Sequence, residues 1–221
     1  MARTLTDDVR WIDLGSVNAY LVDADVLTLV DAGMPWHADD VRSAIRETGA
    51  DPGDVGRLLV THYDPDHVGG IPRLALGDVP VHAGERDADL VAGRRRPRLD
   101  TWKGFTQRIS RVLHDAVEVP VTPVADGDRI GAFEAVHTPG HTRGHTAYVA
   151  DDLDVAFVGD LVTSDGGDLS PTPWYLSADT DAAAESIARL AERVEGISVV
   201  APGHGEPVTS DGGAALASLA T

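Results

Sequence analysis

Histidine and aspartate side chains gather in one short stretch of the sequence, at His62, Asp64, Asp66 and His67. Imidazole nitrogens and carboxylate oxygens are ligands that zinc, iron and manganese accept in proteins. An extended backbone would point residues 62, 64 and 66 to one side, so a tight turn at Pro65 is needed to bring His67 toward a neighbouring ion. The stretch therefore favours a metal site that is built on a loop.

Three further positions carry the same side chains beside glycine or proline, and these are His141, Asp160 and His204. With the first stretch they supply four imidazoles and three carboxylates, which is enough for two metal shells that share one carboxylate. A lone histidine or aspartate is usually a hydrogen-bonded structural residue. Four such groups in one chain favour a binuclear metal centre.

Patterns typical of strands precede these groups, over residues 57–61, 130–137, 154–158 and 197–201. Layered α/β folds place their sites at the C-terminal ends of strands, so these strands would position the ligands. Further strands are indicated over 19–23, 26–31 and 146–150, and amphipathic helices over 38–48 and 179–194. The segment 84–123 has a helical pattern without a chemical motif. Strands interleaved with helices over 221 residues predict a single α/β or α+β domain spanning 1–221.

The motifs resemble those of the metallo-β-lactamase superfamily. The likeness covers nearly the whole chain: Asn18-Ala19-Tyr20-Leu21, residues 29–33, residues 61–70, residues 138–145, Gly159-Asp160 and Pro202-Gly203-His204-Gly205. This resemblance implies a four-layer αββα sandwich with a binuclear site in the cleft between its two sheets.

The resemblance also implies a role for each ligand. His62 and His141 would bind the first metal, Asp66, His67 and His204 would bind the second, and Asp160 would bridge the two. The family signature is His-x-His-x-Asp-His, and this chain departs from it because Asp64 stands in place of the second histidine. A carboxylate there can complete the shell, but it adds negative charge and makes the site harder. We expect two divalent ions, zinc first, with iron and manganese as alternatives.

The expected activity is metal-dependent hydrolysis of an ester, lactone or thioester through a metal-bridging hydroxide. Two ions would lower the pKa of the water between them from about 15.7 toward ~7. Asp66 can hydrogen-bond that hydroxide as well as bind metal, so we expect it to be the catalytic proton shuttle. The alternative on the same fold is an iron-dependent redox enzyme, either a di-iron protein or a persulfide dioxygenase. A non-enzymatic binding module ranks last.

The composition of the chain excludes several classes of binding partner and of chemistry. The net charge is −18, with 36 acidic against 18 basic residues, which argues against nucleic acid and against nuclease activity. The absence of cysteine excludes disulfides, cysteine nucleophiles and thiolate metal sites. No signal peptide or membrane-spanning run is evident, so we expect a cytoplasmic protein that acts on a small molecule away from membranes. A homodimer is compatible with the sequence.

The kinds of charged residue are also uneven. Aspartate supplies 28 of the 36 acids, and Lys103 is the only lysine. Short hydrated carboxylates with little lysine are typical of halophilic surfaces, where salt screens repulsion. A GC-rich genome is the alternative explanation.

Five other features receive structural interpretations. Asp31 is expected to hydrogen-bond a ligand or cap a turn, and His137 and His145 to hydrogen-bond ligands or to face solvent. The aromatic pair Trp174-Tyr175 is interpreted as core, with a pocket wall as the alternative. The run Arg94–Arg96 is interpreted as a solvated patch, with anion binding as the alternative.

Overall fold

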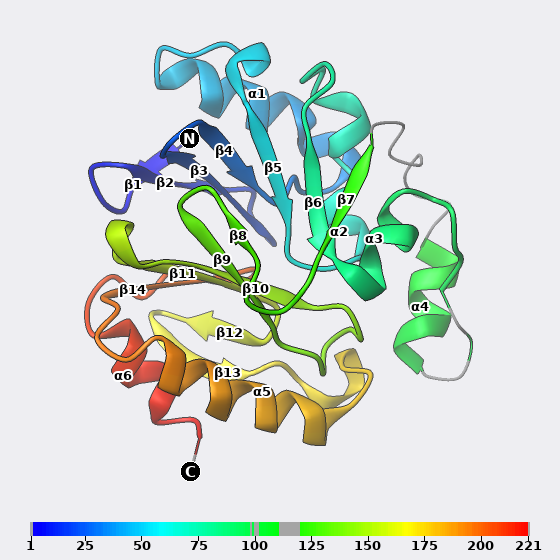
Figure 1. Cartoon of the computed structure of the whole chain (residues 1–221), viewed down its shortest axis with the longest axis vertical. Coiled ribbons are helices and arrows are strands. Elements are labelled where there is room, and N and C mark those ends of the chain that lie inside the picture. The colour runs from blue at the N-terminus through cyan, green and yellow to red at the C-terminus, as the bar shows by residue number, and fades with distance from the viewer. Residues whose placement is uncertain (1, 98, 100–101, 111–119, 221) are drawn as a thin grey trace.

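The structure is a computed structural model that describes residues 2–97, 99, 102–110 and 120–220 (Figure 1). Its strands are β1 (Ala2–Thr4), β2 (Val9–Asp13), β3 (Asn18–Asp23), β4 (Leu27–Val30), β5 (Arg57–Val60), β6 (Val81–Gly84), β7 (Val121–Val124), β8 (Arg129–Ile130), β9 (Phe133–His137), β10 (Thr146–Ala150), β11 (Val155–Gly159), β12 (Val162–Asp165), β13 (Asp168–Pro171) and β14 (Val199–Pro202). Its α-helices are α1 (Ala38–Glu47), α2 (Pro65–Val68), α3 (Glu85–Val91), α4 (Trp102–Ser110), α5 (Thr180–Arg193) and α6 (Gly212–Ala217).

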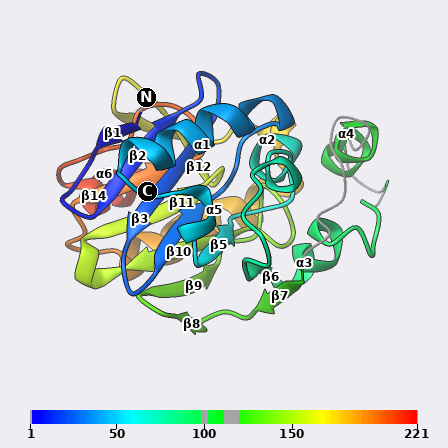
Figure 2. The same ribbon diagram turned by 90° about the horizontal axis from the view of Figure 1, so that it is seen from above.

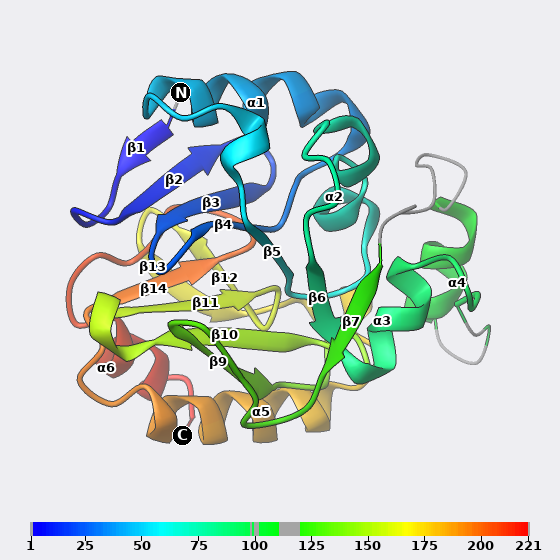
Figure 3. The same cartoon turned by 45° about the horizontal axis from the view of Figure 1, so that its top comes forward.

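Two sheets face each other, and helices cover their outer faces (Figures 1 and 3). The larger sheet has the order β1-β2-β3-β4-β5-β6-β7, and the second has the order β14-β11-β10-β9-β8. Helix α1 lies on the outer face of the first sheet, and α5 and α6 lie on the outer face of the second (Figure 3). The arrangement is the αββα sandwich that the family resemblance implies.

Large aromatic side chains fill the space between the two sheets. Tyr20 from β3 and Phe157 from β11 have ring centroids 5.3 Å apart, and Phe133 lies 6.2 Å from Phe157. All three are almost completely buried. Removing this much apolar area from water favours the packing of the two sheets against each other.

The outer helices bury one apolar face each, as their spacing requires. In α1, Val41, Ala44 and Ile45 recur at three- and four-residue intervals and pack with the residues of the larger sheet. In α5, Ile187 and Leu190 do the same against the second sheet. Both helices begin and end within two residues of the predicted bounds, because this periodicity is strong.

Four strand ends that carry candidate ligands or their partners meet at one edge of the sandwich. Strands β4 and β5 are parallel, as are β11 and β14, so their carboxyl ends point the same way. Two backbone hydrogen bonds join the sheets at this edge, from Asn18 N–H to Gly203 O at 2.8 Å and from Thr146 N–H to Thr61 O at 2.8 Å. The fold therefore brings segments far apart in sequence to one place.

The structure corrects three expectations. The predicted strand over 130–137 is a hairpin, because Gly131 has φ of +60° and turns the chain between β8 and β9. The segment 84–123 contains α3 and α4 as expected, but its end forms β7, which adds a strand to the larger sheet. Trp174 and Tyr175 are 75% and 51% exposed, so their interpretation as core residues is wrong.

Views from above and from the front show α4 beside α3, outside the main body of the sandwich (Figures 1 and 2). Within the described ranges of the chain, no helix combines the length and the apolar character that crossing a membrane requires.

A paired carboxylate in the turn between β3 and β4 allows a test of stability against pH. Asp25 accepts two hydrogen bonds from Arg57, at 2.7 and 2.9 Å, and these bonds lower the pKa of Asp25 to about 2. A lowered pKa means that the stabilisation is present above the usual carboxyl value and lost as pH falls through 2. Because Asp25 is half-exposed, we expect Asp25→Asn to destabilise the protein by only about 0.5–1 kcal/mol near pH 7.

Urea unfolding of both proteins at pH 7, 4 and 3 measures this difference. It should be largest at pH 7, shrink at the lowest pH and decrease in 1 M salt. A difference that is the same at every pH would show that the ion pair does not cause it.

Candidate metal centre

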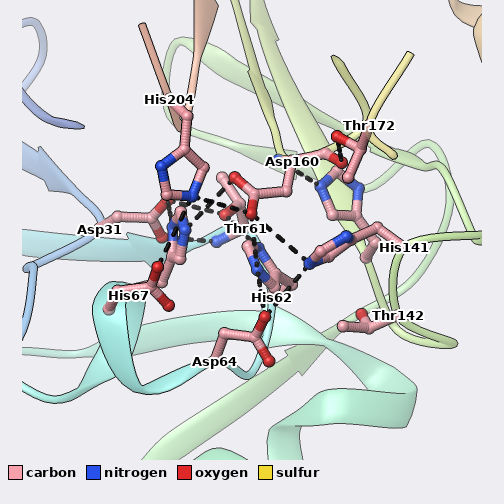
Figure 4. A network of polar contacts seen from close by, with 12 residues as sticks. Asp31, Thr61, His62, Asp64, His67, His141, Thr142, Asp160, Thr172 and His204 are labelled. Carbon is pink, nitrogen blue, oxygen red and sulfur yellow. Dashed lines mark hydrogen bonds and ion pairs between the residues drawn. The ribbon is translucent and has the colours of Figure 1, made fainter. Parts of the chain in front are cut away.

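One carboxylate, that of Asp160 at the end of β11, faces all four candidate imidazoles (Figure 4). Its Oδ2 lies 3.1 Å from His204 Nε2, 3.5 Å from His141 Nε2 and 3.7 Å from His62 Nε2. Its Oδ1 lies 3.3 Å from His67 Nε2. A single carboxylate thus lies between imidazoles from three other segments, the stretch after β5 and the loops after β9 and β14.

The candidate ligands form two clusters. The first contains His62, Asp64, His141 and Asp160, and all four are buried. The second contains Asp66, His67 and His204. The side chains of Asp66 and His204 are 32% and 30% exposed, so the centre meets solvent on the side of the second cluster. The structure thus brings together all seven residues that the sequence singled out.

The spacing of the ligand atoms suits a metal ion. In the first cluster, the nitrogen-to-oxygen distances run from 3.2 to 3.7 Å. Atoms held about 2.0–2.1 Å from one ion at tetrahedral angles lie about 3.3 Å apart. Moreover, His62 Nε2, His67 Nε2 and Asp160 Oδ1 are buried and have no hydrogen-bond partner among the described residues. Buried polar atoms without partners are costly, so these donors fit metal ligation.

Asp31 contacts the ring nitrogen of His67 that faces away from the centre. Asp31 Oδ2 lies 2.8 Å from His67 Nδ1, and the same carboxylate accepts bonds from Thr61 N–H at 2.9 Å and Thr61 Oγ1 at 2.7 Å. These bonds keep Asp31 in a left-handed conformation with φ of +56°, which is unusual for a residue other than glycine. The carboxylate orients the ring so that Nε2 faces the centre. Asp31 therefore acts on a candidate ligand, as one of its two interpretations proposed.

The two histidines that flank His141 differ in burial and in their hydrogen-bond partners. His145 is fully buried, its Nδ1 lies 2.8 Å from Thr138 Oγ1, and its Nε2 accepts the backbone N–H of Asp160 at 3.1 Å. Burial lowers the pKa of His145 well below its ordinary value, so the ring is a neutral acceptor that fixes the Asp160 loop. His137 lies nearer the surface, where its Nε2 is 3.1 Å from Arg143 O.

The loop that carries His204 is fixed by polar side chains of β3. Asn18 Nδ2 donates to Pro202 O at 3.0 Å and to Gly205 O at 2.7 Å, and Tyr20 Oη donates to Pro202 O at 2.6 Å. Gly203 leaves no room for a side chain, because a Cβ there would lie 2.1 Å from Asp160 Oδ1. Glycine thus allows this backbone to pass beside the centre.

Neighbouring charges at the centre shift the pKa values of Asp160 and His67 in the direction opposite to the effect of burial. Burial alone would raise the pKa of Asp160, but His67, His62 and His204 hold it well below its ordinary value. Burial alone would lower the pKa of His67, but Asp160 and Asp31 raise it well above its ordinary value. A metal ion would therefore displace a proton on binding, and its affinity would rise with pH.

Lys103 enters the first cluster from α4, and the metal motifs did not predict it. Its buried Nζ donates to Asp64 Oδ2 and lies 2.7 Å from His141 Nε2. Gln107, one turn further along α4, donates to Asp64 Oδ1 at 2.9 Å. Burial, and then Lys103, lower the pKa of His141 to about 4. Lys103 also holds the pKa of Asp64 well below its ordinary value, although burial would raise it. Its being the only lysine is the one sequence signal that singles it out.

The facing sheets, the outer helices and the clusters at their shared edge define an αββα protein with a candidate binuclear metal centre. Comparison with known families makes this specific. The model of the metallo-beta-lactamase superfamily matches residues 12–204, and the chain belongs to that superfamily.

Sequence relatives and solved structures match most of the chain. The probable metallo-hydrolase YflN of Bacillus subtilis is 28% identical over 202 residues, covering 82% of this chain and 76% of that protein. The subclass B3 metallo-beta-lactamase BJP-1 of Bradyrhizobium japonicum superposes with a TM-score of 0.74 at 23% identity, covering 99% of this chain and 89% of that one. TTHA1623, solved in a di-iron-bound form, has a TM-score of 0.67 at 28% identity, covering 86% and 88%.

Proposed function

We propose that this protein is a metal-dependent hydrolase of an ester, lactone or thioester that uses two divalent ions. The observation that carries the proposal is the Asp160 carboxylate, which lies within 3.1–3.7 Å of an Nε2 atom in each of four imidazoles. Membership of the superfamily and the likeness to a probable metallo-hydrolase support the same class of reaction.

Ions bound here would supply Lewis acidity, polarising a carbonyl oxygen and lowering the pKa of water toward neutrality. Side chains of the protein would transfer the proton and orient the ligands. Asp66 is half-exposed, and its Oδ2 lies 3.6 Å from His204 Nε2 at the solvent side of the centre. Its carboxylate can accept a proton from water there and pass it to the leaving group. His67 is held rigid by Asp31, so little of the centre needs to reorganise during the reaction.

We infer that zinc is the functional metal, with iron or manganese as the alternatives. Asp64 adds an oxygen ligand to the first cluster, which makes that cluster harder than one with three histidines. The likeness to a di-iron-bound structure keeps iron-dependent redox chemistry as the second candidate.

Hydrolysis after controlled metal loading tests the proposal. Chelator-treated protein is reloaded with zinc, manganese or ferrous iron and assayed with aryl esters, thioesters and lactones. We expect hydrolysis of at least one class that disappears with chelator and returns with metal. A coloured iron protein that hydrolyses none of them would favour the redox alternative, and hydrolysis that chelator leaves unchanged would contradict the proposal.

A further inference from the structure

The carboxylate of Asp87 joins two segments that carry ligands of the first cluster. Asp87 lies in the first turn of α3 and is buried, with 2% of the residue exposed. Its Oδ2 accepts one hydrogen bond from Tyr63 N–H at 2.9 Å and another from Thr142 Oγ1 at 2.8 Å. One oxygen atom thus holds two parts of the chain that are far apart in sequence.

Both donors stand beside candidate ligands in the chain. Tyr63 separates His62 from Asp64, and Thr142 directly follows His141. Three of the four ligands of the first cluster therefore adjoin a residue that this carboxylate holds. Because neighbouring residues share a peptide bond, fixing the two donors also fixes the backbone from which the ligand side chains project.

Glycines allow α3 to come close to the segment that leads into β10. A Cβ on Gly144 would lie 2.5 Å from both Cγ and Oδ1 of Asp87, and a Cβ on Gly84 would lie 2.4 Å from Gly144 O. Atoms that are not bonded to each other do not come this close, so only glycine permits the approach. Close backbone packing therefore places the Asp87 carboxylate between its two donors.

A carboxylate at this position is not the choice that stability alone would favour. Burial raises the pKa of Asp87, and the bonds from Tyr63 and Thr142 oppose that shift only in part. Removing a carboxylate from water costs free energy that an apolar side chain of similar size would not cost. The two donors that it orients explain why an acid is buried here.

The second cluster is held by a different carboxylate. Asp31 Oδ2 lies 2.8 Å from His67 Nδ1, and the Asp31 carboxylate also accepts a bond from Thr61 N–H at 2.9 Å. Asp31 thus contacts a ligand ring directly, whereas Asp87 contacts residues beside the ligands. Each cluster therefore has its own buried carboxylate, which is not itself a candidate ligand.

We propose that Asp87 is a positioning residue of the first cluster, which holds the segment of His62 and Asp64 against the loop of His141 so that the three ligands can share one ion. The inference rests on the proposed metal-dependent function. It predicts that loss of Asp87 weakens metal binding at the first cluster and leaves the second cluster unchanged.

Variants that keep one complete cluster at a time test this inference by zinc titration calorimetry. His67→Ala leaves the four ligands of the first cluster, and His62→Ala leaves those of the second. In the His67→Ala background, we expect Asp87→Ala to weaken zinc binding about 10–100-fold, as loss of a residue that orients ligands does. In the His62→Ala background, the same change should not alter the zinc affinity.

Glu85→Ala is the matched control, because it removes the other acidic residue from the first turn of α3 at an exposed position. It should leave the zinc affinity unchanged in both backgrounds. The visible spectrum of cobalt(II) at the first cluster is a second measurement, since it reports the geometry of the ligands. It should change with Asp87→Ala and stay unchanged with Glu85→Ala.

A milder variant keeps the test decisive if Asp87→Ala does not fold. Thr142→Val removes one of the two bonds to the carboxylate and keeps a side chain of similar shape. We expect it to weaken zinc binding at the first cluster by about tenfold or less, as loss of one hydrogen bond implies. An unchanged affinity and cobalt spectrum in this variant would contradict the role of Asp87.

Thermal unfolding of the metal-free variants separates positioning from stability. If Asp87→Ala lowers only the melting temperature and leaves zinc affinity unchanged at both clusters, or weakens both clusters equally, the inference is overturned. It is also overturned if His67→Ala binds no zinc while Asp87 is in place. If no ester, thioester or lactone is hydrolysed, the hydrolase proposal fails, but a loss of zinc affinity confined to the first cluster still supports the role of Asp87.

Discussion

Replacing Asp160 with asparagine should abolish hydrolysis and remove metal from both clusters, while the chain stays folded. The Asp160 carboxylate faces His62, His141 and His204 through Oδ2 and His67 through Oδ1. Asparagine keeps the size of the side chain but loses the negative charge and one of the oxygens. Loss of residues that only orient a metal ligand costs roughly 10–100-fold, so we expect activity to fall by more than about a hundredfold.

Elemental analysis, ester hydrolysis and far-UV circular dichroism of the variant test this expectation together. Asp165→Asn is the matched control, because it makes the same chemical change at an exposed position five residues further along the chain. It should keep the metal content and the activity of the wild type. A folded Asp160→Asn protein with wild-type metal content would contradict the placement of Asp160 between the clusters.

Replacing Lys103 with methionine should change metal binding in the opposite direction. The Lys103 ammonium donates to Asp64 Oδ2 and lies 2.7 Å from His141 Nε2, so it contacts two of the four candidate ligands of the first cluster. A divalent ion must break both contacts and displace a like charge before it can bind there. We therefore expect Lys103→Met to bind zinc at the first cluster at least about tenfold more tightly.

The metal-free form of the same variant should be less stable. Asp64 is buried, and Lys103 compensates its charge; removing one partner of a buried pair costs about 3–5 kcal/mol. Gln107 still donates to Asp64, so we expect the lower end of that range. Zinc should restore the stability that the variant loses.

Zinc titration calorimetry and thermal unfolding, each with and without zinc, measure these effects. The second cluster is an internal reference, because no contact joins Lys103 to Asp66, His67 or His204 in the described part of the chain. Arg108→Met removes a positive charge from the same helix outside the cluster and should behave as wild type. If Lys103→Met left both the zinc affinity and the metal-free stability unchanged, the ammonium would neither oppose metal binding at the first cluster nor compensate the charge of Asp64.

The candidate ligands were predictable because each lies in a loop beside a strand whose apolar pattern is clear. Parallel strands such as β4 and β5 place their carboxyl ends at one edge, so Asp31 and His62 had to lie near each other. The predicted fold class follows from the same alternation of strands and helices. The packing of two apolar sheets brings these segments together in space. The apolar residues of the strands indicate that packing in the sequence.

Lys103, Gln107 and Asp87 could not be predicted in the same way. Lys103 and Gln107 lie one turn apart on a helix with no chemical motif, and only the docking of α4 brings them to Asp64. Asp87 gains its role from contacts with Thr142 and Tyr63, which come from other parts of the chain. Such roles depend on tertiary packing rather than on local spacing.

The arginine run and the aromatic pair show how far local interpretation reaches. Arg94, Arg95 and Arg96 are all exposed, as the interpretation as a solvated patch requires, and Arg94 pairs with Asp89 at 2.8 Å. In contrast, Trp174 is exposed although its residue type favours burial. Whether a ring on a loop is buried depends on the path of that loop, which the pattern of residue types does not determine.

The central claim is that hydrolysis depends on ions held by the two clusters. Metal-free protein is titrated with zinc while bound metal and ester hydrolysis are measured on the same samples. The account predicts that hydrolysis is absent without metal and rises with occupancy to an end point of two ions per chain. Full hydrolysis by the metal-free protein, or saturation with zinc that produces no hydrolysis of any ester, thioester or lactone, would contradict it.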